Sequence, residues 1–158
     1  MGQFAIFGVR VMLVILFTVG VLAQVFWIPD IIESTIHTFP EVAGLRWPGM
    51  IVGVVLVLFL QVAVVCMWRL LTLVDRDAIF ARGSLGPVNV IIAAFGGVAL
   101  TGAVGFAVMT GAGFGPPGVI LMLIGIVVAG VGLALLMLVM RELLIRAMQM
   151  DADLAEVI

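Results

Sequence analysis

Four long apolar runs dominate this chain, and the segments between them carry its charges, prolines and turn residues. A helix needs about 20 apolar residues to cross a bilayer, because each residue adds about 1.5 Å to its length. Lipid offers the backbone no hydrogen bonds, so a span must satisfy its own amides by forming a helix. We therefore predict an all-α integral membrane four-helix transmembrane bundle, with spans at about residues 9–28, 50–72, 88–110 and 119–140.

Composition places the whole chain of 158 residues in a single membrane domain. Hydrophobic residues make up 65% of the sequence and charged residues 10%, whereas a soluble domain carries about 25% charged residues. The mean hydropathy is +1.44, and a surface so poor in charge must be solvated by lipid. The net charge of −2 provides no basic excess for nucleic acid. We expect the lipid bilayer to be a partner of this protein and nucleic acid not to be one.

The distribution of Arg along the chain predicts how it is oriented in the membrane. An even number of spans places both termini on one side, and Arg and Lys concentrate in cytoplasmic segments. Arg46 alone falls on the side opposite the termini, while the other six fall on the terminal side: Arg10, Arg69, Arg76, Arg82, Arg141 and Arg146. Both termini, the 75–87 loop and the 141–158 tail are therefore predicted to be cytoplasmic, with the tail as a helical extension of the last span.

The connection between the first two spans has the pattern of a short amphipathic helix lying at the membrane surface. Asp30 stands as an N-cap with Glu33 three residues later, and Ile32 and Ile36 recur at helical spacing. His37 is the single histidine, and with Glu33 four residues before it, it is a candidate metal ligand or pH sensor. One imidazole and one carboxylate are too few donors for a closed site, so we predict no metal and no cofactor.

Small residues at four-residue spacing predict where the spans pack. In lipid, helices associate through close backbone approach, which small side chains permit. We expect the small-residue faces to line the bundle interior, with self-association as the alternative. They are Ala93, Gly97, Thr101 and Gly105 in the third span, Gly49 and Gly53 in the second, and Gly125 and Ala129 in the fourth.

Two amides, Gln24 and Gln61, lie within the first and second spans. A buried amide seeks a hydrogen-bond partner, so we predict interhelical bonds between the two, or from each to backbone carbonyls. An ion or substrate pathway normally carries an ionisable residue in mid-membrane, and the sequence shows none there. The amides are therefore candidates for a structural link between helices.

The tail repeats apolar residues at the spacing of a coiled coil. Two interpretations remain open at this point. Either the tail packs against the cytoplasmic 75–87 loop, or it presents a docking face for another chain. The residues of this face are Leu143, Ala147, Met150, Leu154 and Val157.

Several short motifs are shared with one family: Trp68-Arg69-Leu70-Leu71, Ile79-Phe80, Arg141-Glu142-Leu143-Leu144 and the closing residues 153–158. With these motifs the chain resembles the bacterial domain-of-unknown-function 2975 membrane proteins over essentially its whole length. The resemblance implies a multi-pass protein of the bacterial inner (plasma) membrane. It also implies a regulatory partner, because members are often found beside small helix-turn-helix regulators, and it supplies no catalytic residue.

These observations favour an accessory or regulatory membrane protein that acts through helix and tail contacts, with a membrane protein or a cytoplasmic regulator as its partner. The alternative is a subunit of a small transporter or channel, which would need a homo-oligomer to build a pathway. We do not expect an enzyme. The two serines, one His and one Cys lie far apart in sequence, whereas catalysis needs partners within hydrogen-bond reach.

Overall fold

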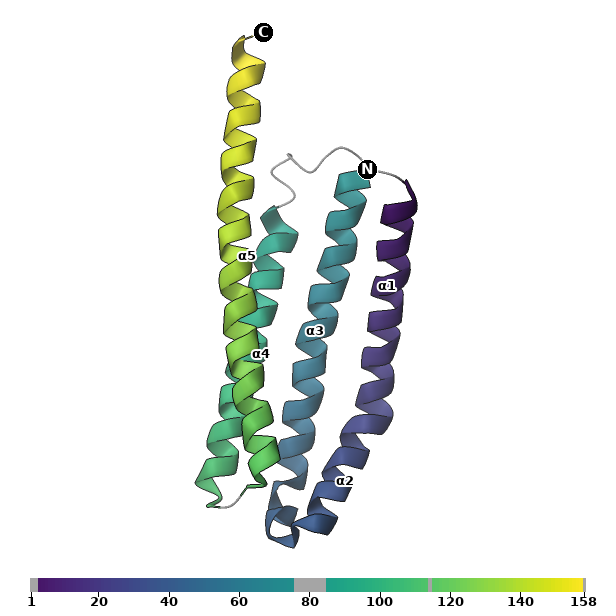
Figure 1. Ribbon diagram of the computed structural model, residues 1–158, viewed down its shortest axis with the longest axis vertical. Coiled ribbons are helices and arrows are strands. Elements are labelled where there is room, and N and C mark those ends of the chain that lie inside the picture. Colours follow the sequence, from purple (N-terminus) through teal and green to yellow (C-terminus); the bar gives the residue numbers. More distant parts are fainter. Residues whose placement is uncertain (1–2, 76–84, 114, 158) are drawn as a thin grey trace.

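The computed structural model describes the backbone of residues 3–75, 85–113 and 115–157, and this part of the chain is helical apart from short turns (Figure 1). Four helical segments are long and apolar enough to cross a membrane, which confirms the all-α, four-span expectation. The elements in chain order are α1 (Gln3–Leu22), the π-helical turn η1 (Ala23–Trp27), α2 (Ile28–Thr38), the 3-10 helix η2 (Pro40–Leu45), α3 (Arg46–Asp75), α4 (Leu85–Gly111) and α5 (Pro117–Val157).

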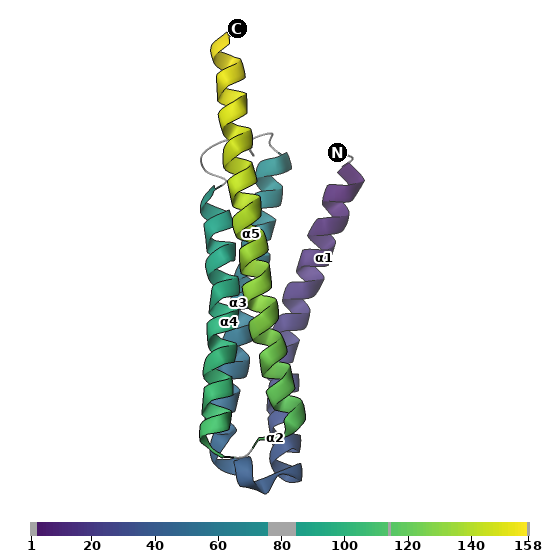
Figure 2. The same ribbon diagram turned by 60° about the vertical axis from the view of Figure 1, so that its left-hand side comes forward.

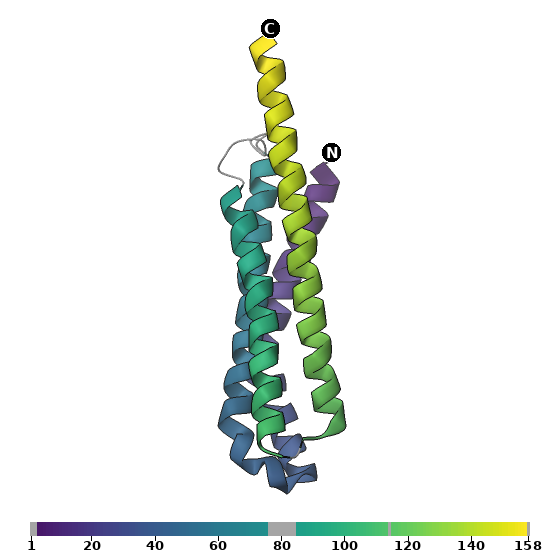
Figure 3. The ribbon, with the colours of Figure 1, turned by 90° about the vertical axis from the view of Figure 1, so that its left-hand side faces the viewer.

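Each long helix contacts the next in the order α5, α4, α3, α1. Helix α4 packs against both α5 and α3, and α1 packs mainly against α3. Toward its N-terminus α1 leans away from the other helices, as Figure 2 shows. Both ends of the chain lie at the same end of the molecule, where α5 extends well past α3 and α4 (Figures 1 and 3).

The core lies between α3, α4 and α5. Ala63 of α3 and Ile91, Ala94 and Phe95 of α4 form a buried cluster. Partly buried side chains from α3 and α5 pack against it, and the lone cysteine, Cys66 of α3, is one of them. Small side chains in this cluster bring the helices close enough for the larger side chains to interdigitate, which is how packing stabilises helix association in lipid.

The first span continues further than the sequence pattern indicated. Helix α1 passes through η1 directly into α2, so residues 3–38 form one helical path. The expected amphipathic helix is present as α2, but it begins at Ile28 in continuation of the first helix, so the prediction of Asp30 as its N-cap was wrong. The N-cap position of α2 is Trp27, with helical φ and ψ and no side-chain cap. Pro29 follows closely after the π-helical turn η1, where the regular i→i−4 bonding is already interrupted and the missing N–H of proline is tolerated.

Candidate functional site

The two amides predicted to link the spans lie together between the first helical path and α3. The Gln61 Nε2 group donates to Gln24 Oε1 at 3.4 Å, and Gln24 Nε2 donates to the backbone carbonyl of Val54 at 3.4 Å. Gln61 is only 8% exposed. Both predicted kinds of partner, the other amide and a backbone carbonyl, are therefore present in one short chain of bonds.

Local backbone structure places this amide pair. Gln24 lies in the π-helical turn η1, and a π-turn inserts an extra residue that re-aims the side chains around it. One turn earlier Gly20 leaves space for the partner, because a Cβ there would lie 3.2 Å from Gln61 Nε2. The arrangement is neutral and has no group that ionises, so its chemistry is that of a hydrogen-bonded link between helices.

A second link between the same helices lies nearer the terminal end. The guanidinium carbon of Arg10 lies 5.9 Å from the centre of the Trp68 ring, within the range of a cation–π interaction. The sequence pattern predicted that Arg10 lies near the end of the first span, but it did not predict the pairing of Arg10 with Trp68. That pairing depends on which helix is the neighbour of α1.

Only part of the predicted small-residue stripe of α4 packs against a neighbouring helix. A Cβ at Gly97 would fall 2.5 Å from the Phe59 ring of α3, and one at Gly105 would fall 3.1 Å from Val52 of α3. Thr101 is partly buried, but Ala93 is exposed. The stripe therefore faces α3 at Gly97 and Gly105 and leaves the interior at Ala93.

The small residues of α5 predicted to pack, Gly125 and Ala129, do not line the bundle interior, and their alternative role in self-association stays a prediction. A Cβ at Gly125 would meet nothing within 4 Å, and Ala129 is exposed. The close approach is at Gly130 instead, where a Cβ would lie 2.9 Å from the backbone nitrogen of Ala99 in α4. Gly125 and Ala129 have the four-residue spacing of small residues that is typical of helix packing, but they lie on the face of α5 that turns away from α4.

Gly49 and Gly53 of α3 approach α2 rather than another long helix. A Cβ at Gly53 would lie 3.0 Å from Ile28, and one at Gly49 would lie 3.9 Å from Ile32. Nearby, Glu33 forms an ion pair with Arg46 at 2.8 Å. The carboxylate considered as a metal ligand with His37 is therefore held by a cation, and the described residues contain no group of three His, Cys, Asp or Glu side chains that could hold a metal ion.

The predicted tail face lies in the C-terminal part of α5 (Pro117–Val157), the helix that extends past α3 and α4 (Figure 3). Leu143 is 53% exposed and Met150 is 63% exposed, while Ala147 is partly buried. Leu154 and Val157 belong to the same helix, but their side chains fall outside the described residues, as does most of the 75–87 loop. The structure therefore describes an exposed apolar face at two of the five predicted positions.

Comparison with known proteins gives one family. The family model described as "Protein of unknown function (DUF2975)" matches residues 31–158. The matched region begins within α2 and contains α3, α4 and α5, so α1 lies before it. No curated protein and no solved structure matches the chain.

Proposed function

The chain belongs to the DUF2975 family, and on that premise we propose that it is an accessory or regulatory membrane protein which acts through its helices and through the extension of α5. The observation that carries this proposal is the extension itself. Helix α5 continues past the ends of α3 and α4, and Leu143 and Met150, both within residues 141–158, are exposed. With the extension in the cytoplasm, as this proposal has it, these apolar side chains would face water, which favours burial against a partner.

The extension has the local features of a helix that keeps its shape without a neighbour. Its residues from Arg141 to Met150 are mostly strong helix formers. Glu142 and Arg146 form an i,i+4 ion pair at 3.6 Å, which adds modest support on an exposed helix. Leu143 and Met150 are seven residues apart and so share one face. A partner that presents an apolar helix or groove would fit this face.

The proposal also covers the orientation of the protein in the membrane and the lack of a catalytic role. We place the protein in the bacterial inner membrane with the α5 extension in the cytoplasm, on the strength of the Arg distribution. We assign it no catalytic role, since the polar link between the spans consists of neutral amides. A transporter subunit remains the competing function, and it requires an oligomer in which several copies line a pathway.

Neighbouring residues on the extension provide a matched test. Met150→Asp places a charge on the apolar face, whereas Gln149→Asp places the same charge at an exposed position beside it. Burial of a Met side chain contributes about 1.5–3 kcal/mol, so Met150→Asp is expected to lower recovery of a crosslinked partner from native membranes at least tenfold. Quantitative mass spectrometry of the crosslinked complexes provides the measurement.

The control variant Gln149→Asp is expected to keep the partner. Equal recovery with both variants, together with an unchanged partner set after removal of residues 141–158, would contradict the proposal. A closed ring of several copies in the native mass of the detergent-solubilised protein would favour the transporter subunit instead.

A further inference from the structure

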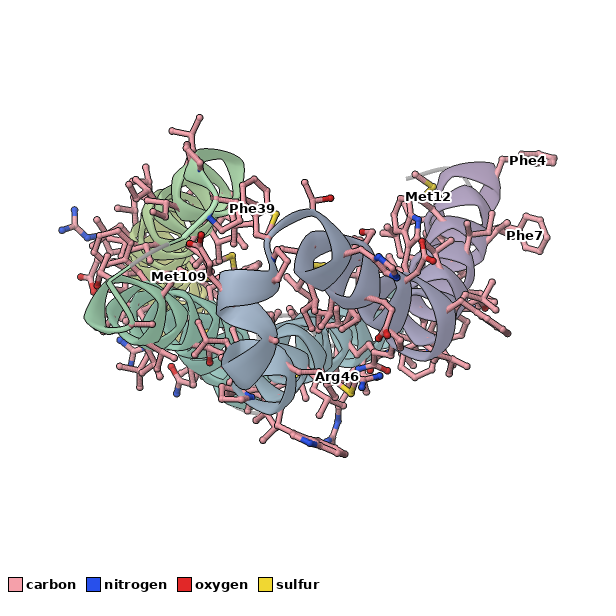
Figure 4. All side chains as sticks on the ribbon, turned by 90° about the horizontal axis from the view of Figure 1, so that it is seen from below. Phe4, Phe7, Met12, Phe39, Arg46 and Met109 are labelled. Carbon is pink, nitrogen blue, oxygen red and sulfur yellow. The ribbon has the colours of Figure 1, made fainter. Side chains whose placement is uncertain are left out.

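A cavity of about 200 Å³ lies at the η2 end of the molecule, between α2 and the α4–α5 pair. Ile31 and Thr35 of α2 form one wall, Met109 of α4 and Met122 of α5 form the other, and Val52 of α3 belongs to the floor. Figure 4 views the molecule from this end, with the α1–α2 column and the α4–α5 pair on either side of α3. Val42 and Leu45 of η2 also line the cavity, so five elements contribute to it.

The cavity follows from how α2 is held. Ile28 and Ile32 pack onto the two glycines of α3, Gly53 and Gly49, which brings α2 against α3. The main contacts of α2 are with η1, η2 and α3, so α2 does not close onto α4 and α5. The space beside it is bounded by these contacts of two isoleucine side chains with the glycines of α3.

The lining is suited to a hydrocarbon chain. Its side chains are apolar apart from Thr35 and Arg46, and the Thr35 hydroxyl already donates to the Ile31 carbonyl at 2.7 Å. An apolar cavity of about 150 Å³ stays free of water and accepts a small hydrocarbon. The rim residues Ile31 and Met122 are 49% and 55% exposed on the surface that membrane-spanning helices turn toward lipid, so a lipid chain can enter from the side.

The charged side chains at the η2 end favour one kind of lipid head group. Arg46 lines the cavity and pairs with Glu33 at 2.8 Å, and both side chains are more than half exposed. Asp30 and Glu41 add two further exposed carboxylates at this end, which disfavours a head group with net negative charge. A zwitterionic head matches the pair, with its phosphate on the guanidinium of Arg46 and its ammonium beside the carboxylate of Glu33.

We propose that this cavity binds one acyl chain of a zwitterionic phospholipid, whose head group lies on the Arg46–Glu33 pair. The site is separate from the α5 extension, so its failure would leave the proposed function untouched. The exposed ion pair opens at little cost, because such pairs contribute little to stability, and both of its members can therefore turn to the lipid head.

Photocrosslinking in vesicles tests the acyl-chain site. The full chain is reconstituted in phosphatidylcholine vesicles that contain a trace of phosphatidylcholine with a diazirine in its acyl chain. Labelling is expected at Met109 and Met122 above that at Leu121, which is exposed and lies outside the cavity. Thr35→Trp fills the cavity and is expected to reduce labelling at Met109 and Met122 at least fivefold.

Ser34→Trp is the matched control for this variant. Ser34 is the preceding residue, also donates to the Ile31 carbonyl, at 2.9 Å, and lies outside the lining. It is expected to leave the labelling unchanged, while circular dichroism and elution volume check that both variants fold. Equal labelling in the two variants, or equal labelling of Leu121 and Met122, would overturn the site.

The head-group assignment has its own test. Glu33→Gln removes the partner of the ammonium group, so the ratio of labelling by phosphatidylcholine to labelling by an anionic phosphatidylglycerol probe is expected to fall at least threefold. Asp30→Asn removes an equal charge from the same helix without touching the ion pair, and its effect is expected to be less than half as large. Equal effects of the two variants would overturn the assignment to the Arg46–Glu33 pair.

Discussion

At the scale of single residues, the most consequential polar contact within the spans joins Gln24 to Gln61. An amide in apolar surroundings is costly unless it is hydrogen-bonded, and each of these amides takes part in a bond of 3.4 Å. That distance is long for a hydrogen bond, which indicates a modest contribution. Gly20 is part of the same arrangement, since a side chain there would compete with Gln61 for space.

A double-mutant cycle with Gln24→Leu and Gln61→Leu measures this contact. Interhelical hydrogen bonds in membranes contribute about 0.6–2 kcal/mol, so we expect a coupling free energy within that range for unfolding in mixed detergent micelles. Thr18→Val is the control, because Thr18 donates only to the Val14 carbonyl of its own helix, at 2.8 Å. A coupling indistinguishable from zero would show that the two amides do not stabilise each other.

At the scale of elements, α4 is the helix on which the packing depends, because it contacts both α3 and α5. It presents Gly97 and Gly105 to α3 and Gly102 to α5. Gly130 of α5 completes the second contact against the backbone of Ala99. A backbone neighbour cannot turn aside as a side chain can, so α4 and α5 would have to separate to admit any larger residue at Gly130.

Gly97→Leu is expected to destabilise the protein by about 1–3 kcal/mol, the usual cost of overpacking. The added side chain would collide with the Phe59 ring, which already lies 2.5 Å from the position of a Cβ. Gly96→Leu is the matched control, since a Cβ at the neighbouring Gly96 meets nothing within 4 Å. Thermal unfolding in detergent gives the comparison.

Removal of the Phe59 ring provides a second check on this contact. Phe59→Ala should recover part of the stability lost in Gly97→Leu, because it vacates the space that the new side chain needs. If Gly96→Leu and Gly97→Leu lowered the melting temperature equally, the α3–α4 contact at Gly97 would not be the cause.

At the scale of the whole molecule, three helices form the packed part and the first is attached at its side. Helix α1 packs mainly against α3, with Arg10 over the Trp68 ring, and the amide pair joins η1, directly after α1, to α3. Near its N-terminus Phe4 and Phe7 point away from the other helices (Figure 4). Arg10 lies at the end of the molecule that holds both termini, and Arg46 lies at the η2 end. This separation of charge is the basis for the predicted orientation.

Cysteine accessibility tests that orientation. In a Cys66→Ala background, Ser34→Cys is expected to react with a membrane-impermeant maleimide in intact cells, because α2 lies at the end opposite the termini. Ser84→Cys should react only after the membrane is permeabilised. Labelling of Ser84→Cys alone from outside would reverse the assigned sidedness and would place the α5 extension outside the cell.

The sequence by itself determined the number of spans, the helical fold and the presence of small-residue faces and of two amides within the spans. These features depend on the length and composition of local segments, because lipid forces any sufficiently long apolar segment into a helix. The local pattern also indicated that Gln24 and Gln61 need partners, since an amide cannot be left unpaired in apolar surroundings.

Only the tertiary structure decided which faces of the helices pack against one another. A span that is apolar all around carries no pattern that marks its packed side, so the sequence could not choose Gly130 over Gly125 or place Ala93 outside the interface. The continuation of the helix through Pro29 and the pairing of Arg46 with Glu33 depend on the path of the chain near η2. The cavity beside α2 exists for the same reason, because it is the space left when separate helices meet at fixed glycine contacts.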